Sequence, residues 1–234
     1  MATRNDLGQP VGATLDGWTP PPAPQPVTLE GRWCRLVPLD PGAHARPLFE
    51  AFAEDRDGRL WTYMAYGPFA GFEDFAGVLD GLAARPDMVF FTILDAASGA
   101  PRGLAAYLRI DPRMGSVEVG SITYAPVLQQ TAAATEAMAL MMRHAFELGY
   151  RRYEWKCDAL NEPSRRAALR LGFTFEGIFR QHFVIKGRNR DTAWYAILDH
   201  EWPRLAAAFD GWLAPENFDG AGRQKRPLAG FTGQ

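Results

Sequence analysis

The chain has 234 residues, of which 47% are hydrophobic and 22% are charged, so its composition is that of a globular protein. A chain of this length buries enough surface to hold a core without a metal or a disulfide framework. Lysine and arginine total 25 and aspartate and glutamate total 27, which leaves a net charge of −2. This balance lacks the basic character of proteins that bind nucleic acid or an anionic membrane. We therefore expect neither partner.

The cysteines and histidines further restrict the classes of protein to which the chain can belong. The two cysteines, Cys34 and Cys157, lie far apart in strand-like apolar segments, which excludes a disulfide framework and favours the reducing cytoplasm. The polar N-terminus leads into no apolar segment, so we expect no secretory signal. The four histidines show neither an HExxH motif nor Cys/His ligand spacing, so we expect no metal.

Both ends of the chain differ in composition from its middle. Residues 1–28 are rich in proline and predict an extended arm. The arm is either a disordered leader or a segment packed across the domain or onto a second subunit of a homodimer, with Trp18 and Val27 as anchors. Residues 214–234 are rich in glycine, proline and polar residues and predict a flexible C-terminal tail. The folded domain is then expected over 29–213.

Hydrophobic periodicity predicts the elements of this domain in chain order. Alternation predicts a first strand at 32–39, and apolar residues at helical spacing predict helices at 43–54 and 72–84. The elements expected after these are strands at 88–94, 103–110 and 116–124, a helix at 131–148, a strand at 152–157, a helix at 162–171, and strands at 173–185 and 192–198. Helices, an antiparallel meander, one helical crossover and a closing hairpin define an α+β fold with a mixed sheet.

A loop of small side chains joins the strand that ends at Tyr124 to the long helix. The N-terminus of a helix exposes unpaired N–H groups and the positive end of the dipole, so it attracts phosphate. The alanines at 132–134 would let an anion approach this backbone closely. A plain amphipathic helix shows the same pattern, so this segment by itself leaves both interpretations open.

A second motif-bearing segment, 157–173, follows the next strand. Together the two segments and the closing hairpin carry, in order, Gln129 to Ala134, Asn161, Ser164, Leu171-Gly172-Phe173, Glu176-Gly177, Arg180, Asp191 and Tyr195. In this order and spacing they resemble the GNAT acyltransferase superfamily over about residues 29–202. The branch resembled is that of the RimJ/RimL-type enzymes, which acetylate protein N-termini. The resemblance implies a GNAT-like, mostly antiparallel twisted sheet flanked by helices.

The resemblance implies acetyl-CoA as cosubstrate. The family's pyrophosphate loop reads Gln/Arg-x-x-Gly-x-Gly/Ala, and its positions are filled here by Gln129, Gln130, Thr131, Ala132, Ala133 and Ala134. Backbone N–H groups near Ile122 and Thr123 would polarise the thioester, and donors aimed at a developing oxyanion contribute strongly to catalysis. Asn161 and Ser164 would contact the cofactor from the next helix, although Asn161 also fits a simple helix cap.

Two positions depart from the family pattern. Ala132 stands where the loop has glycine, so a methyl group lies where the phosphates pass or where a positive φ is needed. Ala168 stands where many members have a tyrosine general acid, which RimJ/RimL-like members often lack too. Ser164 or solvent is then expected to protonate the leaving thiolate.

The acceptor amine must lose a proton before it attacks, and a carboxylate acting through water is the usual solution. Glu118 is the leading candidate for this base; alternatively it pairs with an arginine on an exposed strand face. Among the aromatic residues of 61–69, Tyr66 and Phe69 are expected to line the acceptor pocket. Arg180 is expected to face the acceptor.

These observations predict an acetyl-CoA-dependent N-acetyltransferase that moves the acetyl group directly to a primary amine, because neither cysteine lies in a nucleophile setting. The acceptor is a peptide or protein N-terminus or a small amine. The net charge of −2 slightly favours a cationic acceptor. Ala132 and Ala168 also motivate a different interpretation, in which a catalytically degenerate GNAT-fold protein binds a CoA ester or a protein partner.

Overall fold

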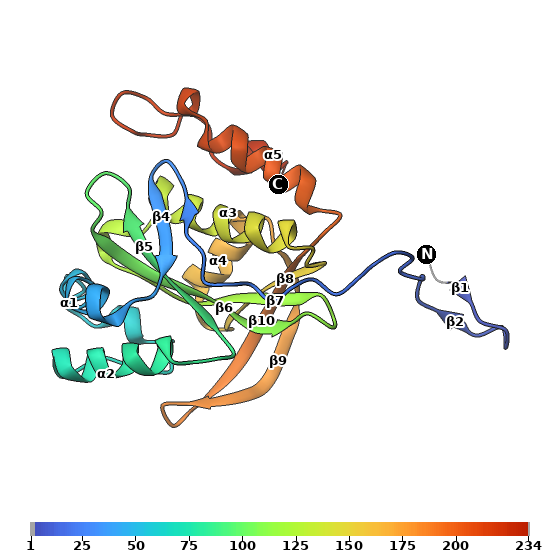
Figure 1. Cartoon of the computed structure of the whole chain (residues 1–234), viewed down its shortest axis with the longest axis horizontal. Coiled ribbons are helices and arrows are strands. Elements are labelled where there is room, and N and C mark those ends of the chain that lie inside the picture. The colour runs from blue at the N-terminus through green and yellow to red at the C-terminus, as the bar shows by residue number, and fades with distance from the viewer. Residues whose placement is uncertain (1–2, 234) are drawn as a thin grey trace.

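Eight strands form one twisted sheet in the computed structural model, which describes residues 3–233 (Figure 1). The strands are β3 (Leu29–Glu30), β4 (Cys34–Pro38), β5 (Val89–Asp95), β6 (Pro101–Asp111), β7 (Ser116–Tyr124), β8 (Arg152–Asp158), β9 (Thr174–Ile185) and β10 (Arg188–Leu198). Their order in space is β3-β4-β5-β6-β7-β8-β10-β9, and only β7 and β8 are parallel neighbours. The predicted α+β fold with a mixed, mostly antiparallel sheet is confirmed.

Helices cover both faces of the sheet. They are α1 (Pro41–Phe52), α2 (Phe72–Ala83), α3 (Ala132–Glu147), α4 (Glu162–Arg170), α5 (Trp202–Leu213) and α6 (Ala229–Thr232), with 3₁₀ turns at η1 (Arg59–Trp61), η2 (Pro126–Leu128) and η3 (Pro215–Asn217). Side chains alternate between the two faces along a strand. Leu104 of β6 packs with α1 and α2, whereas Tyr107 donates a hydrogen bond of 2.6 Å to the carbonyl of Met141 in α3. α4 and α5 share the α3 face.

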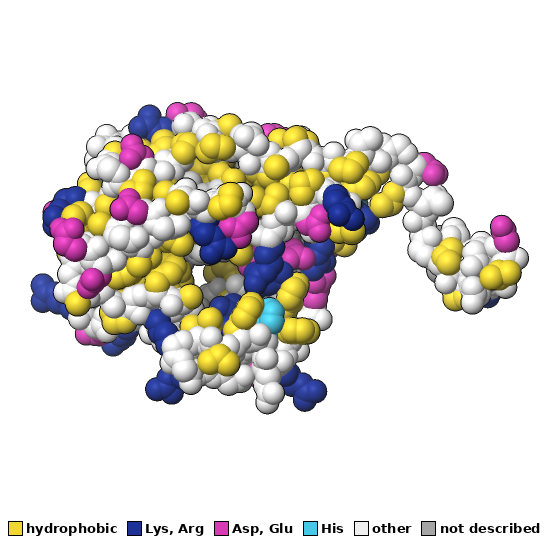
Figure 2. All heavy atoms as spheres, turned by 60° about the horizontal axis from the view of Figure 1, so that its bottom comes forward, with side chains coloured by type: hydrophobic (Ala, Val, Ile, Leu, Met, Phe, Trp, Pro, Cys, Tyr) yellow, Lys and Arg dark blue, Asp and Glu magenta, His cyan; other side chains and the backbone are white. Residues whose placement is uncertain are grey.

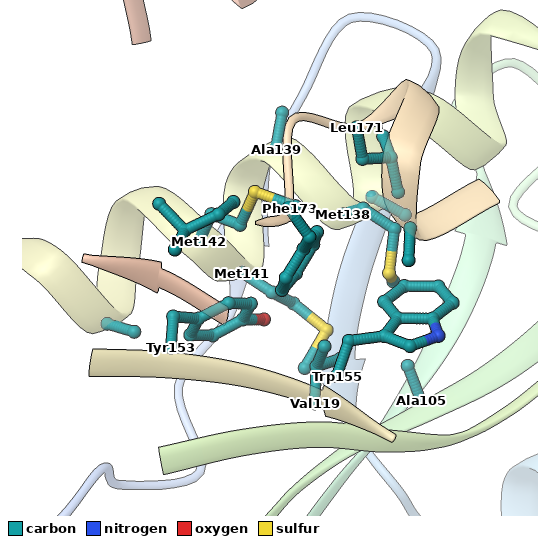
Figure 3. Close-up of a cluster of buried hydrophobic side chains, with 14 of the residues drawn as sticks. Ala105, Val119, Met138, Ala139, Met141, Met142, Tyr153, Trp155, Leu171 and Phe173 are labelled. Atoms are coloured by element: carbon teal, nitrogen blue, oxygen red, sulfur yellow. The ribbon is translucent and has the colours of Figure 1, made fainter. Parts of the chain in front are cut away.

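The larger core lies between α3 and the centre of the sheet (Figure 3). Met138, Met141 and Met142 of α3 face Tyr153 and Trp155 of β8, and none of the five is more than 5% exposed. The methionines recur at the three- and four-residue spacing that brings side chains onto one face of a helix. This packing fixes α3, and with it the loop that precedes α3, against the sheet.

The two parallel strands separate before they end. β7 and β8 pair only from Ser116 to Val119 on β7, opposite 152–155 on β8. Beyond Val119, β7 stays paired with β6 and β8 stays paired with β10. A bulge follows at Ser121 and Ile122, which have no pairing partner on β6, and Ser121 adopts a φ of 51°. The ends of β7 and β8 therefore part directly before the chain enters α3 and α4.

The N-terminal arm first crosses the body and then projects from it. Pro21 is buried, and Trp18 packs so closely on Gly115 that a Cβ there would lie 2.8 Å from the indole. Farther toward the terminus, β1 (Thr3–Arg4) and β2 (Pro10–Val11) form a hairpin that extends away from the sheet (Figure 1). The arm was expected to be either a disordered leader or a packed segment. The structure shows it packed on the domain over part of its length.

The C-terminal segment differs from the expectation. α5 lies beyond the last predicted element and buries Leu205, Phe209 and Trp212. The segment 214–234 was expected to be flexible, yet Leu228 is 1% exposed and Asn217 donates a hydrogen bond of 2.9 Å to the carbonyl of Trp212. The segment also contains η3 and the short helix α6, so its glycines and prolines exclude neither short helices nor such contacts.

Candidate active site

The start of α3 presents a set of free backbone amides. Thr131 caps the helix, because its Oγ1 accepts a hydrogen bond of 3.1 Å from the amide of Ala134. Within the described chain, the amides of residues 130–133 donate no hydrogen bond. Four unpaired N–H groups at the N-terminus of a 16-residue helix suit an anionic ligand.

The loop before α3 takes its unusual conformation at Gln130 and not at Ala132. Gln130 has a φ of 60°, and it is the single residue of 129–134 with a positive φ. Ala132 begins the helix in ordinary geometry, so alanine causes no backbone strain there. Gln129 steadies the loop by donating through Nε2 to the carbonyl of Tyr124 at 3.1 Å. The expected conflict at Ala132 is thereby reduced to the volume of one methyl group.

The bulge of β7 lies on the same side of the molecule as this loop. Ser121 and Ile122 lie opposite a single residue of β6, and no strand pairs with the other edge of β7 beyond Val119. The backbone near Ile122 and Thr123 therefore borders the opening between β7 and β8. The role that the resemblance implies for these two residues, polarisation of the thioester, stays a prediction.

Asn161 and Ser164 lie across that opening, at the start of α4. Asn161 is the cap of the helix, because its Oδ1 accepts from the amide of Ser164 at 3.2 Å. The Oγ of Ser164 accepts a hydrogen bond of 3.0 Å from the indole Nε1 of Trp155. Ala168, at the position of the family's tyrosine, is fully buried in the core. Ser164 is therefore the hydroxyl of α4 that borders this end of the sheet.

Glu118 is buried and ion-paired. Its Oε2 lies 2.6 Å from Arg109 and 3.0 Å from the Nζ of Lys156. Lys156 also lies 2.6 Å from Glu154, and Glu154 pairs in turn with Arg152 at 2.6 Å. The expected arginine pair is thus observed, but not the exposed strand face, because Glu118 is 3% exposed. The pair belongs to a row of alternating charges on one face of the sheet. Whether Glu118 also acts as a base stays a prediction.

The aromatic cluster between α1 and α2 lies beside the bulge. The rings of Tyr66 and Phe69 pack on Trp61 at centroid distances of 6.1 and 4.9 Å. The hydroxyl of Tyr66 is buried and makes no hydrogen bond with the described residues, and the side chains of Thr123 and Ser121 are its polar neighbours. Burial raises the pKa of Tyr66 to about 12. The cluster therefore joins the core to the open side of β7.

Two polar contacts that the sequence did not indicate hold this region together. The Nζ of Lys186, in the turn between β9 and β10, donates to the carbonyl of Trp61 at 2.7 Å. The hydroxyl of Tyr63 donates to the carbonyl of Leu160 at 3.1 Å. The β9–β10 hairpin and the loop before α4 are thereby both tied to the segment between α1 and α2. Figure 2 shows the surface hollowed beside this hairpin, with Lys and Arg side chains around the hollow.

Arg180 and His182 lie on β9, the strand at the edge of the sheet. Arg180 is exposed, and His182 contacts Thr192 through Nδ1 at 3.0 Å. Burial, followed by the nearby cations Arg109 and Arg190, lowers the pKa of His182. The histidine is therefore neutral at pH 7.

Neither cysteine has the properties of a nucleophile. Cys34 and Cys157 are both free and buried. Burial raises the pKa of each thiol above its ordinary value, so neither is a thiolate at neutral pH. Among residues 3–233, no group of three or more His, Cys, Asp or Glu residues is arranged to hold a metal ion, and no helix is long and apolar enough to cross a membrane.

Comparison with known proteins identifies the family. The model of the acetyltransferase (GNAT) domain matches residues 34–174. A GCN5-related N-acetyltransferase from Brucella melitensis is 49% identical, with a TM-score of 0.91 over 94% of this chain and 100% of that one. A probable GNAT-family acetyltransferase from Chromobacterium violaceum is 37% identical, with a TM-score of 0.78 over 83% of this chain and 98% of that one. No curated protein matches the sequence. The chain belongs to the GNAT acetyltransferase family.

The same fold is found in a more distant enzyme. RimL, described as a ribosomal L7/L12 alpha-N-protein acetyltransferase, is 20% identical, with a TM-score of 0.64 over 74% of this chain and 94% of that one. At this identity the likeness concerns the fold alone.

Proposed function

We propose that the protein is an acetyl-CoA-dependent N-acetyltransferase that passes the acetyl group directly to a primary amine. One observation carries the proposal: the free amides of residues 130–133 begin α3 at the end of the sheet where β7 and β8 part. The amides suit the pyrophosphate of a nucleotide, and the parted strands leave a path for its extended arm. Membership of the GNAT family supports acetyl transfer.

Backbone groups, more than side chains, hold and activate acetyl-CoA, the acetyl donor. Acetyl-CoA supplies a thioester when it is bound. The loop 129–134 holds the pyrophosphate, and backbone N–H groups near Ile122 and Thr123 stabilise negative charge that develops on the carbonyl oxygen. Asn161 contacts the cofactor while it caps α4. Because backbone donors are fixed before the reaction, they need little reorganisation in the transition state.

Transfer requires two proton movements. The amine nitrogen attacks the thioester carbonyl carbon, a C–N bond forms, and the C–S bond breaks with release of a thiolate. Glu118 takes the proton of the amine through a water molecule, and Ser164 gives a proton to the thiolate. The two buried, protonated cysteines support direct transfer, because neither thiol offers a covalent route.

The acceptor approaches from the hollow beside the β9–β10 hairpin. Tyr66 and Phe69 line its pocket and Arg180 lies at its rim. The acceptor is a peptide or protein N-terminus or a small amine, and the fold that this chain shares with RimL supports the first of these by analogy. We propose the reducing cytoplasm as its compartment, because both cysteines are free.

The test is transfer to a panel of primary amines and of N-terminal peptides. Release of free CoA thiol, together with the gain of one acetyl group by the amine in mass spectrometry, would support the proposal. Binding of acetyl-CoA without transfer to any amine would contradict it and would favour a catalytically degenerate protein instead.

A further inference from the structure

The β9–β10 hairpin carries an excess of positive charge. Its residues 180–191 hold four cations, Arg180, Lys186, Arg188 and Arg190, and one carboxylate, Asp191, in a chain whose net charge is −2. None of the four cations forms a salt bridge with any part of the chain that the structure describes. Asp191 instead accepts hydrogen bonds from the amide of Gln181 and the side chain of Asn189.

These cations border the acceptor side of the candidate active site. Lys186 donates to the carbonyl of Trp61 at 2.7 Å, which holds the tip of the hairpin against the segment that carries Tyr66. The guanidinium of Arg190 lies 5.5 Å from the ring of Phe183, and that of Arg109 lies 5.8 Å from the same ring. The Nε of Arg190 is buried with no partner among residues 3–233. Figure 2 shows Lys and Arg side chains at the rim of the hollow, among hydrophobic and acidic ones.

Charge is balanced inside the site and unbalanced outside it. Within the sheet, Glu118 faces Arg109 and Lys156, and Glu154 faces Lys156 as well. A reacting amine that enters there meets carboxylates that are paired with cations. The excess lies on the hairpin, so it acts on the part of the acceptor that stays outside.

The length of the charged strip distinguishes a peptide from a small molecule. β9 bulges at residues 180–182, because Phe179 and Phe183 pair with Thr192 and Arg190 on β10. The length of the strip is therefore taken along β10, where Thr192 to Arg188 lies opposite Phe179 to Ile185 and spans four residues, or about 13 Å at about 3.3 Å per residue. An extended peptide of about four residues covers this distance, whereas a single amino acid does not.

From this arrangement we infer that the acceptor is a peptide or protein N-terminus followed by acidic residues, which the β9–β10 hairpin holds while the amine reacts. The inference rests on the proposed function and specifies its acceptor. It reverses the slight preference for a cationic acceptor that the net charge indicated, because local charge next to a site outweighs net charge at this range.

The experiment compares three octapeptides that begin with serine and differ at their second to fourth positions, which are acidic, replaced by the matching amides, or basic. We expect kcat/KM for the acidic peptide to exceed that for the amide peptide roughly tenfold at low salt, and the advantage to shrink as salt is added. Arg188→Glu should lower kcat/KM for the acidic peptide roughly tenfold while the KM for acetyl-CoA stays constant. Arg35→Glu, the same change on exposed β4, is the matched control and should have no effect.

Calorimetric titration of each peptide, and of a single-stranded RNA, into the CoA-loaded protein separates the two proposals. Tight binding of the acidic peptide without acetylation would overturn the proposed function, and with it the assignment of the peptide as acceptor, although the hairpin would still bind acidic peptides. Equal acetylation of all three peptides, or a preference for the basic one, would overturn the inference and leave the function standing. Binding of the RNA alone, or of no peptide, would also overturn the inference.

Discussion

The indole Nε1 of Trp155 donates a hydrogen bond to the Oγ of Ser164 over 3.0 Å. An indole has a donor and no acceptor, so the direction of this bond is fixed. The hydrogen of the Ser164 hydroxyl is therefore free to point elsewhere. This polarity suits a group that protonates a departing thiolate at the opening between β7 and β8, where the family's tyrosine is replaced by the buried Ala168.

Replacing Ser164 with alanine is expected to lower kcat roughly 10²-fold, because a positioned proton donor is lost and water replaces it poorly. The KM for acetyl-CoA should change little. The Trp155→Phe variant removes the indole donor and keeps the hydroxyl, so it should retain most of its kcat. Steady-state kinetics decides: an unchanged kcat in Ser164→Ala would assign the proton to solvent.

The Glu118→Gln variant tests whether Glu118 is the general base that deprotonates the amine. We expect a lower kcat and loss of the acidic limb of the pH–rate profile, because the amide cannot accept a proton from the amine. The matched control is Glu154→Gln on β8, which removes the charge from the other carboxylate that pairs with Lys156. Both variants should be less stable, by about 3 kcal/mol, because each leaves a buried charge with fewer partners. Identical pH–rate profiles in the two variants would remove Glu118 from the chemistry.

Glu136 connects α3 to the loop before β4. Its carboxylate accepts hydrogen bonds from the amides of Arg32, Trp33 and Cys34 at 2.7–2.8 Å. We expect Glu136→Ala to lower the free energy of unfolding by at least about 3 kcal/mol, because hydrogen bonds to a charged group are lost and three amides are left unpaired. Urea denaturation measures this loss. Glu147→Ala, at an exposed position of the same helix, should change it by less than about 0.5 kcal/mol, and an equal loss in both would contradict the account.

His44 is built into the fold in its neutral form. Its Nδ1 accepts from the amide of Asp40 at 3.1 Å, and burial lowers its pKa. The folded state then binds fewer protons than the unfolded chain, whose histidine pKa is about 6.5, so the free energy of unfolding falls as the pH drops through that value. Denaturation between about pH 7 and pH 5 should show this fall, and His44→Gln should show a smaller one. A fall of the same size in the variant would exclude this role.

The sequence was sufficient to predict the helices and strands in which hydrophobic residues recur at a regular spacing. Met138, Met141 and Met142 indicate the buried face of α3, and the alternation of β7 places Glu118 opposite the core residues Val117 and Val119. The period of α5 was also present, since Leu205, Phe209 and Trp212 recur at helical spacing. No element was predicted there, although residues 202–213 were placed within the folded domain.

Contacts between distant segments could not be predicted from the sequence. Lys186 and Trp61 are 125 positions apart, and Tyr63 and Leu160 are 97 apart. Neither pair leaves a periodic signal, because one polar contact at a loop needs only the right residue at the right point in space. The charge of the hairpin was visible in the sequence, but its location beside the site depends on the Lys186 contact.

Calorimetric titration of acetyl-CoA into the protein tests the central claim most directly. We expect binding with a low-micromolar dissociation constant, despite the methyl group of Ala132. The Ala132→Asp variant adds a carboxylate to the first turn of α3, which should weaken binding about tenfold or more while the free energy of unfolding changes by less than about 1 kcal/mol. No binding to the unaltered protein at millimolar acetyl-CoA, or equal binding to the variant, would contradict the assignment of this loop.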